Sequence, residues 1–212
     1  MGAKISEYGG KRIVVRFDSH KCIHSRNCVL SRPDVFVPNA PGDWIIPDQA
    51  PPDAVAEIAH VCPSGAISYE RIDGGPQEAA PKVNLVRVRE NGPLAFHADL
   101  DLSGETTFRA TLCRCGASRS KPYCDGSHVS EKFSATGEPA SAESQPLAKR
   151  DGRVTVTAAK NGPLLVKGNL EVVTGTGRTI LRTQSTALCR CGGSSNKPYC
   201  DGTHNKIGFA AD

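Results

Sequence analysis

Two stretches of the chain repeat the same order of apolar and polar positions. Residues 83–89 and 154–157 alternate between apolar and polar side chains, which is typical of β-strands with one buried face. Each is followed by an Asn-Gly-Pro-Leu segment, and Asn-Gly favours a tight hairpin turn. Residues 94–102 and 164–173 are then expected to be the return strands. The pattern predicts two β-rich modules built on one plan.

The first part of the chain follows a different pattern. Residues 53–62 have apolar side chains at helical spacing, with Asp53 placed to cap the start and Pro63 after the end. Three short segments are candidate strands: 12–17, 43–47 and 67–69. We expect a small mixed domain here.

Segments rich in Gly, Pro, Ser and Ala divide the chain. Residues 73–81 and 134–145 have this composition and predict linkers. The expected domains are therefore 1–75, 82–140 and 147–212. Modules this small bury little apolar surface by themselves. We expect an α+β chain whose two β-rich modules pack as a pseudo-twofold pair sharing one core.

Composition narrows the function classes. A chain with only 5% aromatic residues suits loop-rich modules that need metals or disulfides for stability. A net charge of +4 is too small to predict nucleic-acid binding. The sequence lacks an apolar run of about 18 residues and the apolar core of a signal peptide, so we expect a cytoplasmic protein that does not bind membranes.

The nine cysteines form three groups of three, and an odd total argues against a closed set of disulfides. In a reducing compartment, clustered cysteines bind metals more often than they pair. The groups are Cys22, Cys28 and Cys62, then Cys113, Cys115 and Cys124, then Cys189, Cys191 and Cys200.

The last two groups belong to one repeated motif with the spacing Cys-x-Cys-x8-Cys-x3-His, which ends at His128 and at His204. Upstream of the motif the second module is longer by six residues around 174–178, as a lengthened hairpin would be. Three thiolates and an imidazole also suit zinc. With only one residue between them, however, the cysteines of Cys-x-Cys can bind one tetrahedral ion only with difficulty. The spacing therefore favours a diiron centre, in which the ligands are divided between two metals.

Both copies resemble the CDGSH iron–sulfur domain of mitoNEET-like proteins. The resemblance rests on Cys-x-Cys-x2-Ser-x3-Pro-x-Cys-Asp-Gly-Ser/Thr-His and covers residues 82–212. It implies a 2Fe–2S cluster in each copy. In the first copy it assigns Cys113 and Cys115 to one iron, and Cys124 and His128 to the other. In the second copy it assigns the ligands in the same order: Cys189, Cys191, Cys200 and His204.

The remaining motif positions suggest supporting roles. Asp125 and Asp201 are expected to bond nearby backbone rather than relay protons. Ser118 and Ser194 are expected to donate hydrogen bonds near the ligands. The motif also carries basic residues that either balance an anionic cluster or are solvated at the surface: Arg114, Lys121, Arg190 and Lys197.

Cys22, Cys28 and Cys62-Pro63 resemble the cluster ligands of a single-cluster ferredoxin, with Ser25 at the position of the middle cysteine. The match covers about residues 10–72 and makes 1–75 a ferredoxin-like domain. Three thiolates suit a 3Fe–4S cluster. A 4Fe–4S cluster would need Ser25, His24 or solvent as its fourth ligand, and His24 is expected at the surface instead. The alternative is a degenerate domain with three free thiols.

Together these features predict an electron-transfer protein with two 2Fe–2S clusters and one 3Fe–4S cluster. One alternative is storage or transfer of clusters to apo-proteins, and another is a zinc-bound interaction module. The sequence shows no Gly-rich nucleotide loop and no nucleophile–base pair, so we do not expect an enzyme. The expected partner is a redox protein or an apo-protein that accepts clusters, and the expected state is a monomer with an internal pseudo-dimer.

The histidine ligands lead to a first prediction. Neutral imidazole in place of thiolate raises the reduction potential, and a proton can displace it from the metal. We expect acid-labile clusters whose reduction is coupled to protonation. Changing both His128→Cys and His204→Cys should alter the visible bands and abolish the pH dependence, measured by absorption and by pH-dependent potentials. Unchanged bands with the original pH dependence would contradict the prediction.

Overall fold

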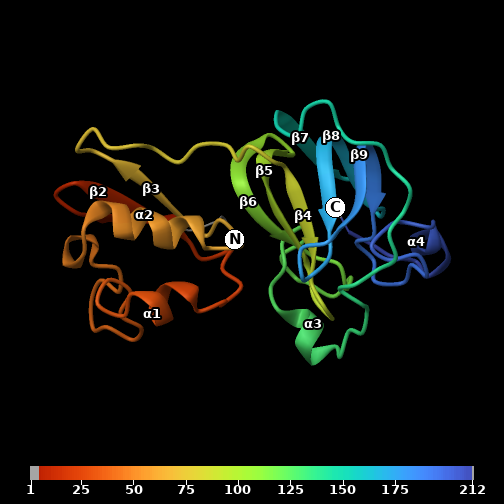
Figure 1. The fold of residues 1–212 in the computed structure, drawn as a ribbon. Coiled ribbons are helices and arrows are strands. Elements are labelled where there is room, and N and C mark those ends of the chain that lie inside the picture. Colours follow the sequence, from red (N-terminus) through yellow and green to blue (C-terminus); the bar gives the residue numbers. More distant parts are fainter. Residues whose placement is uncertain (1–4, 212) are drawn as a thin grey trace. The chain divides into compact units, whose positions relative to one another are not determined.

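The computed structural model describes residues 5–211. They divide into two compact units, one ending at Ala79 and the other beginning at Ala80, and each has its own apolar core (Figure 1). No helix in the described part of the chain is both long and apolar enough to cross a membrane.

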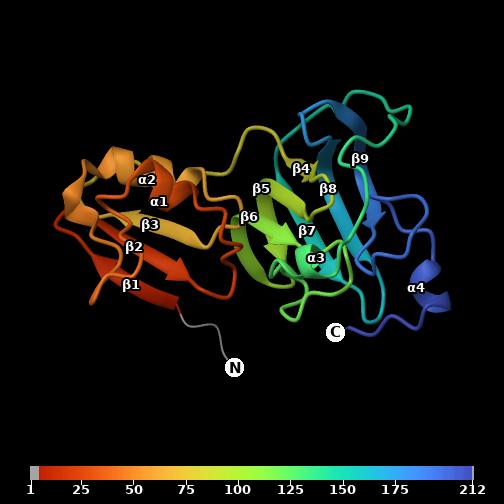
Figure 2. The ribbon, with the colours of Figure 1, turned by 90° about the horizontal axis from the view of Figure 1, so that it is seen from below.

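The first unit is a three-stranded antiparallel sheet with two helices on one face (Figure 2). Its strands pair in the order β1-β2-β3, because β2 pairs with β1 on one edge and with β3 on the other. Its core gathers apolar side chains of β2, β3, α2 and the intervening loops. The elements are β1 (Ile5–Gly9), β2 (Ile13–Asp18), α1 (Asn27–Ser31), the 3-10 helix η1 (Pro47–Gln49), α2 (Pro52–His60) and β3 (Ile67–Arg71).

The helix over 53–62 and the strands over 12–17 and 67–69 are confirmed, with ends shifted by one to two residues. The strand over 43–47 is wrong. Ile45 forms only an isolated bridge with Phe36, and Pro47 starts η1 instead. Proline has no N–H to donate to a sheet, so the segment cannot continue as a paired strand.

Asp53 was expected to cap α2, and this is also wrong. The helix begins at Pro52, and its cap position is Pro51, which makes no side-chain cap bond. Proline suits the first helical turn because the N–H it lacks would have no partner there. The Asp53 carboxylate instead accepts a hydrogen bond from Arg71 at the end of β3.

The second unit is one six-stranded sheet to which both copies of the repeat contribute. Each copy supplies a short strand and then a long hairpin. Two one-turn helices, α3 (Ser127–Ser130) and α4 (Thr203–Lys206), lie outside the sheet (Figure 1). The strands are β4 (Leu85–Val88), β5 (Leu94–Leu102) and β6 (Glu105–Leu112), then β7 (Arg153–Ala158), β8 (Leu164–Val173) and β9 (Thr179–Leu188).

The short strands pair reciprocally. β4 runs antiparallel to β5 of its own copy and parallel to β8 of the other. β7 runs antiparallel to β8 of its own copy and parallel to β5 of the other. Each short strand therefore ties the two hairpins together. The apolar core under the sheet accordingly takes residues from both copies, such as Val86, Leu100, Val154 and Val172.

The six extra residues lengthen the β8–β9 hairpin, as predicted. Its strands have ten residues each, against nine and eight in β5 and β6. Its wider turn is closed by a bond from the Thr174 N–H to the Arg178 carbonyl. The segment predicted as a linker between the copies lies alongside this hairpin. Glu138 accepts bonds from Thr176, and the Ala142 N–H donates to the Ile180 carbonyl.

One difference between the copies allows a stability prediction. The Tyr123 hydroxyl donates to Glu105 at 2.6 Å, whereas the buried Tyr199 hydroxyl has no hydrogen-bond partner among the described residues. Leu181 takes the place of Glu105 in the second copy. An unpaired buried hydroxyl costs about 1–3 kcal/mol, while a typical bond adds about 1 kcal/mol.

We therefore expect Tyr199→Phe to leave the free energy of unfolding unchanged or to raise it by about 1 kcal/mol. The matched change Tyr123→Phe should lower it by about 1 kcal/mol. Urea unfolding followed by circular dichroism measures both. Equal losses in the two variants would show that the Tyr199 hydroxyl has a partner after all.

Candidate metal centres

The first candidate site lies in the loop that follows β6 and in α3. The sulfur atoms of Cys113 and Cys115 are 3.7 Å apart. Cys124 follows Tyr123, which forms a bridge with Leu112, and its sulfur lies 3.5 Å from Nδ1 of His128. The four predicted ligands are thus brought together as two pairs.

The second candidate site repeats this arrangement after β9 and in α4. The Cys189 and Cys191 sulfur atoms are 3.8 Å apart, and the Cys200 sulfur is 3.4 Å from Nδ1 of His204. We call the two sets of four residues the first site and the second site.

These distances fit metal ligation. Two sulfurs at about 2.3 Å from one tetrahedral metal lie about 3.8 Å apart, and a sulfur and an imidazole nitrogen lie about 3.5 Å apart. Within residues 5–211, no three His, Cys, Asp or Glu side chains are placed to hold a single metal ion. Each pair of ligand atoms has the separation expected of two ligands on one tetrahedral metal.

Glycine and aspartate shape the turn that brings the histidine back. Gly126 has φ of 86°, which is favourable for glycine, and it starts the turn of α3 that contains His128. The Asp125 carboxylate accepts bonds from the Ser127 and Arg119 N–H groups at 3.0 and 2.9 Å. These bonds hold the pKa of Asp125 at about 2 in spite of its partial burial.

In the second copy, Asp201 accepts equivalent bonds from the Thr203 and Ser195 N–H groups, and Gly202 has φ of 83°. The predicted backbone role of both aspartates is therefore confirmed.

The thiols of the first site differ in ionisation. Burial raises the pKa of Cys124 to about 11, and the bond with Cys113 raises the pKa of Cys115. The bond with the Cys115 thiol lowers the pKa of Cys113 to about 6, and the N–H groups of Ser118 and Gly116 act in the same direction against burial. Thiolate is the form that binds metals. Burial lowers the pKa of His128, so its imidazole is neutral at pH 7, as ligation requires.

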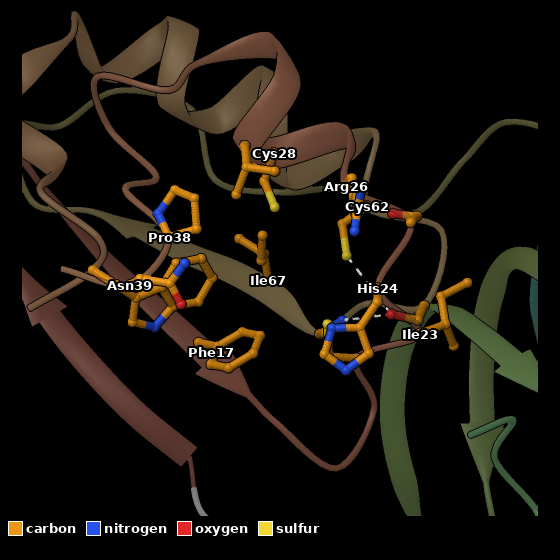
Figure 3. Close-up of a pocket in the computed structure, with 15 residues that line it drawn as sticks. Phe17, Ile23, His24, Arg26, Cys28, Pro38, Asn39, Cys62 and Ile67 are labelled. Carbon is orange, nitrogen blue, oxygen red and sulfur yellow. Dashed lines mark hydrogen bonds between the residues drawn. The ribbon is translucent and has the colours of Figure 1, made fainter. Parts of the chain in front are cut away.

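The three N-terminal cysteines line one cavity of about 420 Å³. Cys22 precedes α1, Cys28 lies within it, and Cys62 follows α2. Figure 3 shows the sulfur atoms of Cys28 and Cys62 turned toward the space lined by Ile67 and Phe17. Since a water molecule occupies about 30 Å³, this apolar cavity suits a group much larger than one metal ion.

The three thiols are close enough to influence one another. Burial raises the pKa of Cys28, and the nearby Cys62 and Cys22 raise it further. Burial also raises the pKa of Cys22, against a bond from the His24 N–H. Ser25 and His24 lie at the exposed edge of the same cavity, so both are near the position of the missing cysteine.

Comparisons with known proteins agree with this geometry. A family described as "Iron-binding zinc finger CDGSH type" matches residues 81–129 and 161–205, and one described as "Divergent 4Fe-4S mono-cluster" matches residues 8–71. The rat CDGSH iron-sulfur domain-containing protein 1 is 30% identical over 77 residues, which are 36% of this chain and 68% of the rat protein. The chain belongs to the CDGSH iron–sulfur family. It is a tandem member with an N-terminal iron–sulfur domain.

Two further relatives are similar to this CDGSH protein. Ferredoxin-2 of Streptomyces griseolus is 41% identical over 59 residues, which are 26% of this chain and 92% of that ferredoxin. The Escherichia coli protein YjdI is 38% identical over 63 residues, 29% of this chain and 80% of its own length.

One arginine in each CDGSH motif has a role that the sequence does not indicate. Arg114 is 1% exposed, although surface solvation was one of its two expected roles. Its guanidinium donates to four backbone carbonyls, two in the turn after β4 and two in the segment after α3. It also lies 5.3 Å from the Phe133 ring centroid. Arg114 thus clamps three segments around the first site.

Arg190 makes the same clamp in the second copy. It is 0% exposed, donates to the carbonyls of Gly162, Ala159 and Ala211, and lies 5.5 Å from the Phe209 ring centroid. The equal offset of Phe133 and Phe209 from the motifs was the one sequence signal for this clamp.

The serine and lysine side chains of the motif also act on the backbone. The Ser118 hydroxyl donates to the Tyr123 carbonyl at 2.6 Å, and the Lys121 ammonium donates to the Ser118 carbonyl at 2.6 Å. Ser194 and Lys197 make the equivalent bonds. The hydroxyls were expected to donate near the ligands. They donate to the carbonyl of the residue directly before the third cysteine and so fix the loop that leads to it.

The clamp predicts a stability effect. Arg114→Lys removes the planar fork that reaches four carbonyls. The Arg89 and Ala135 carbonyls keep backbone N–H donors, but the buried Gly92 carbonyl loses the guanidinium, at about 1–3 kcal/mol, and the ties between the segments are lost as well. We expect the free energy of unfolding to fall by at least about 2 kcal/mol, measured by urea unfolding. Arg119→Lys is the matched control, because this side chain is 92% exposed in the same loop. Equal effects of the two changes would rule out the clamp.

Proposed function

We propose that this protein is an electron carrier with two 2Fe–2S clusters, in the first and second sites, and one 3Fe–4S cluster. Cys22, Cys28 and Cys62 are the proposed ligands of the third cluster. The observation that carries the proposal is the separation of the ligand atoms within each pair. In both copies the Cys–Cys and Cys–His separations are those of two ligands on one tetrahedral metal.

The clusters would supply one-electron chemistry, and the chain would set their surroundings. Cys113, Cys124 and Cys189 are buried, which keeps water from the sulfurs. The Gly126 N–H lies 3.4 Å from the Cys124 sulfur and donates to it, and the Ala117 N–H donates to Cys115 at 3.5 Å. Donors to the sulfurs stabilise the more negative, reduced state.

We further propose that the two copies are related by a pseudo-twofold axis, which makes the second unit an internal dimer within a monomer. The reciprocal pairings of β4 with β8 and of β7 with β5 support this arrangement. We also propose that the first unit has a ferredoxin-like fold, which the match of residues 8–71 to the divergent 4Fe-4S mono-cluster family supports.

The proposed partner is a redox protein that meets the histidine side of either site. His128 and His204 are only partly buried, and Val129, next to His128, is 73% exposed. The histidine side would therefore be the shortest route for an electron to leave. The same exposure favours a second candidate function, the donation of intact clusters to apo-proteins, since an accessible imidazole is the ligand most easily displaced.

Metal analysis and EPR spectroscopy of anaerobically purified protein test the proposal. We expect about seven iron atoms per chain, two from each diiron site and three from the N-terminal site. Cys22→Ser with Cys28→Ser should remove only the three-iron signal, whereas Ser25→Cys should convert it to a four-iron signal. Zinc with no visible absorption would contradict both candidate functions.

Two further measurements separate the candidate functions. Rapid, reversible reduction with all iron retained supports electron transfer. Loss of clusters to an apo-ferredoxin within minutes, with matching gain by the acceptor, supports donation and contradicts the carrier role.

A further inference from the structure

The first and second sites meet backbone to backbone. Cys115 pairs with Cys191 in an isolated antiparallel bridge. The glycine after each cysteine lies against the cysteine of the other copy. A Cβ atom added to Gly116 would lie 2.8 Å from the carbonyl carbon of Cys191, and one added to Gly192 would lie 2.8 Å from that of Cys115. Real Cβ atoms do not come this close, so a side chain at either position would push the opposite cysteine away.

The other motif glycine shows that this contact is a separate requirement. Gly116 and Gly126 have nearly equal φ angles, 84° and 86°. Both therefore suit glycine for conformational reasons. A Cβ added to Gly126 would meet nothing within 4 Å, whereas one added to Gly116 would meet the other copy. Gly192 and Gly202 differ in the same way.

The bridge also joins the ligand pairs of the two sites. Cys115 is paired with Cys113 in the first site, and Cys191 with Cys189 in the second. Arg114 stands between the two cysteines of the first pair and is buried.

We propose that Gly116 and Gly192 are positioning residues for the metal site of the opposite copy. Because Gly116 has no Cβ atom, the Cys191 backbone can take the position that places its sulfur in the second site. Gly192 allows the same for Cys115 in the first site. Each site then depends on the other copy, and a cluster that orders one cysteine loop also orders the other. This inference rests on the proposed function, because it concerns the two sites assigned to the diiron clusters.

The test uses the full chain with the first site removed by Cys113→Ser and Cys124→Ser. In this background the second unit retains only the second site, so any change in its cluster comes from across the bridge. Gly116→Ala should shorten the half-life of the second-site visible band under a chelator by about tenfold or more. Gly126→Ala, with the same backbone strain but no contact, should leave it within about twofold.

Two measurements distinguish a specific effect on the second site from a general loss of stability. They are the unfolding midpoint of the iron-free variants and the EPR spectrum of the second site. Gly116→Ala should shift this spectrum, and Gly126→Ala should not. Equal half-lives and equal spectra for the two glycine variants would overturn the inference while leaving the proposed function intact. A wild-type chain that binds no diiron cluster would overturn the proposed function itself.

A second measurement needs no glycine variant and applies even if Gly116→Ala fails to fold. The wild-type iron-free chain is given limiting iron and sulfide and examined by native mass spectrometry. Coupled sites should yield chains with no diiron cluster or with two, and fewer chains with one than independent sites give. A distribution that matches independent filling would overturn the inference.

Discussion

The second unit depends on the exchange of short strands between the two copies. A hairpin alone is marginally stable, and each copy has only one long hairpin. β4 and β7 resolve this because each hydrogen-bonds to the hairpin of its own copy and to that of the other. The two hairpins thereby become one sheet over one core. Neither copy can reach the observed structure without the other.

The candidate metal sites are held in place by the sheet that this exchange of strands creates. β6 and β9 end at Leu112 and Leu188, which are fully buried in the shared core, and the first cysteine of each site follows at once. From there the buried guanidinium of Arg114 or Arg190 fastens the loop to the turn after the short strand. A fixed sheet end and a fixed clamp leave the ligands little freedom, which is how a metal site gains a defined geometry.

Short-range sequence signals predicted much of this structure. The alternation in 83–89 and 154–157, with Asn-Gly turns, identified β4, β5, β7 and β8, because side chains on a half-buried strand must alternate. The repeated spacing of cysteine and histidine identified both sets of residues that the structure brings together in pairs. The six-residue insertion identified the longer hairpin correctly, since a hairpin tip tolerates added length.

Long-range contacts explain what the sequence could not predict. Whether Arg114 is solvated or buried depends on carbonyls 21–25 residues away, and its own neighbours do not indicate them. The predicted helix cap at Asp53 was wrong for the same reason. Its carboxylate accepts a hydrogen bond from Arg71, which is 18 residues away in the sequence. Likewise, the sequence shows that Gly116 and Gly126 are both glycines of the motif. Only the fold shows that one of them touches the other copy.

A tandem chain also escapes a constraint of a symmetric dimer. In a twofold homodimer each substitution occurs on both sides of the interface. Here the two copies differ. Glu105, the partner of Tyr123, is replaced by Leu181 at the equivalent position of the second copy. Lys121 lies 5.9 Å from the Phe209 ring centroid, with no matching Lys197–Phe133 contact among the described residues. The ligand spacing is nevertheless identical in both copies. The tandem chain therefore allows the surroundings of the two copies to differ while both copies keep the same spacing of Cys and His residues.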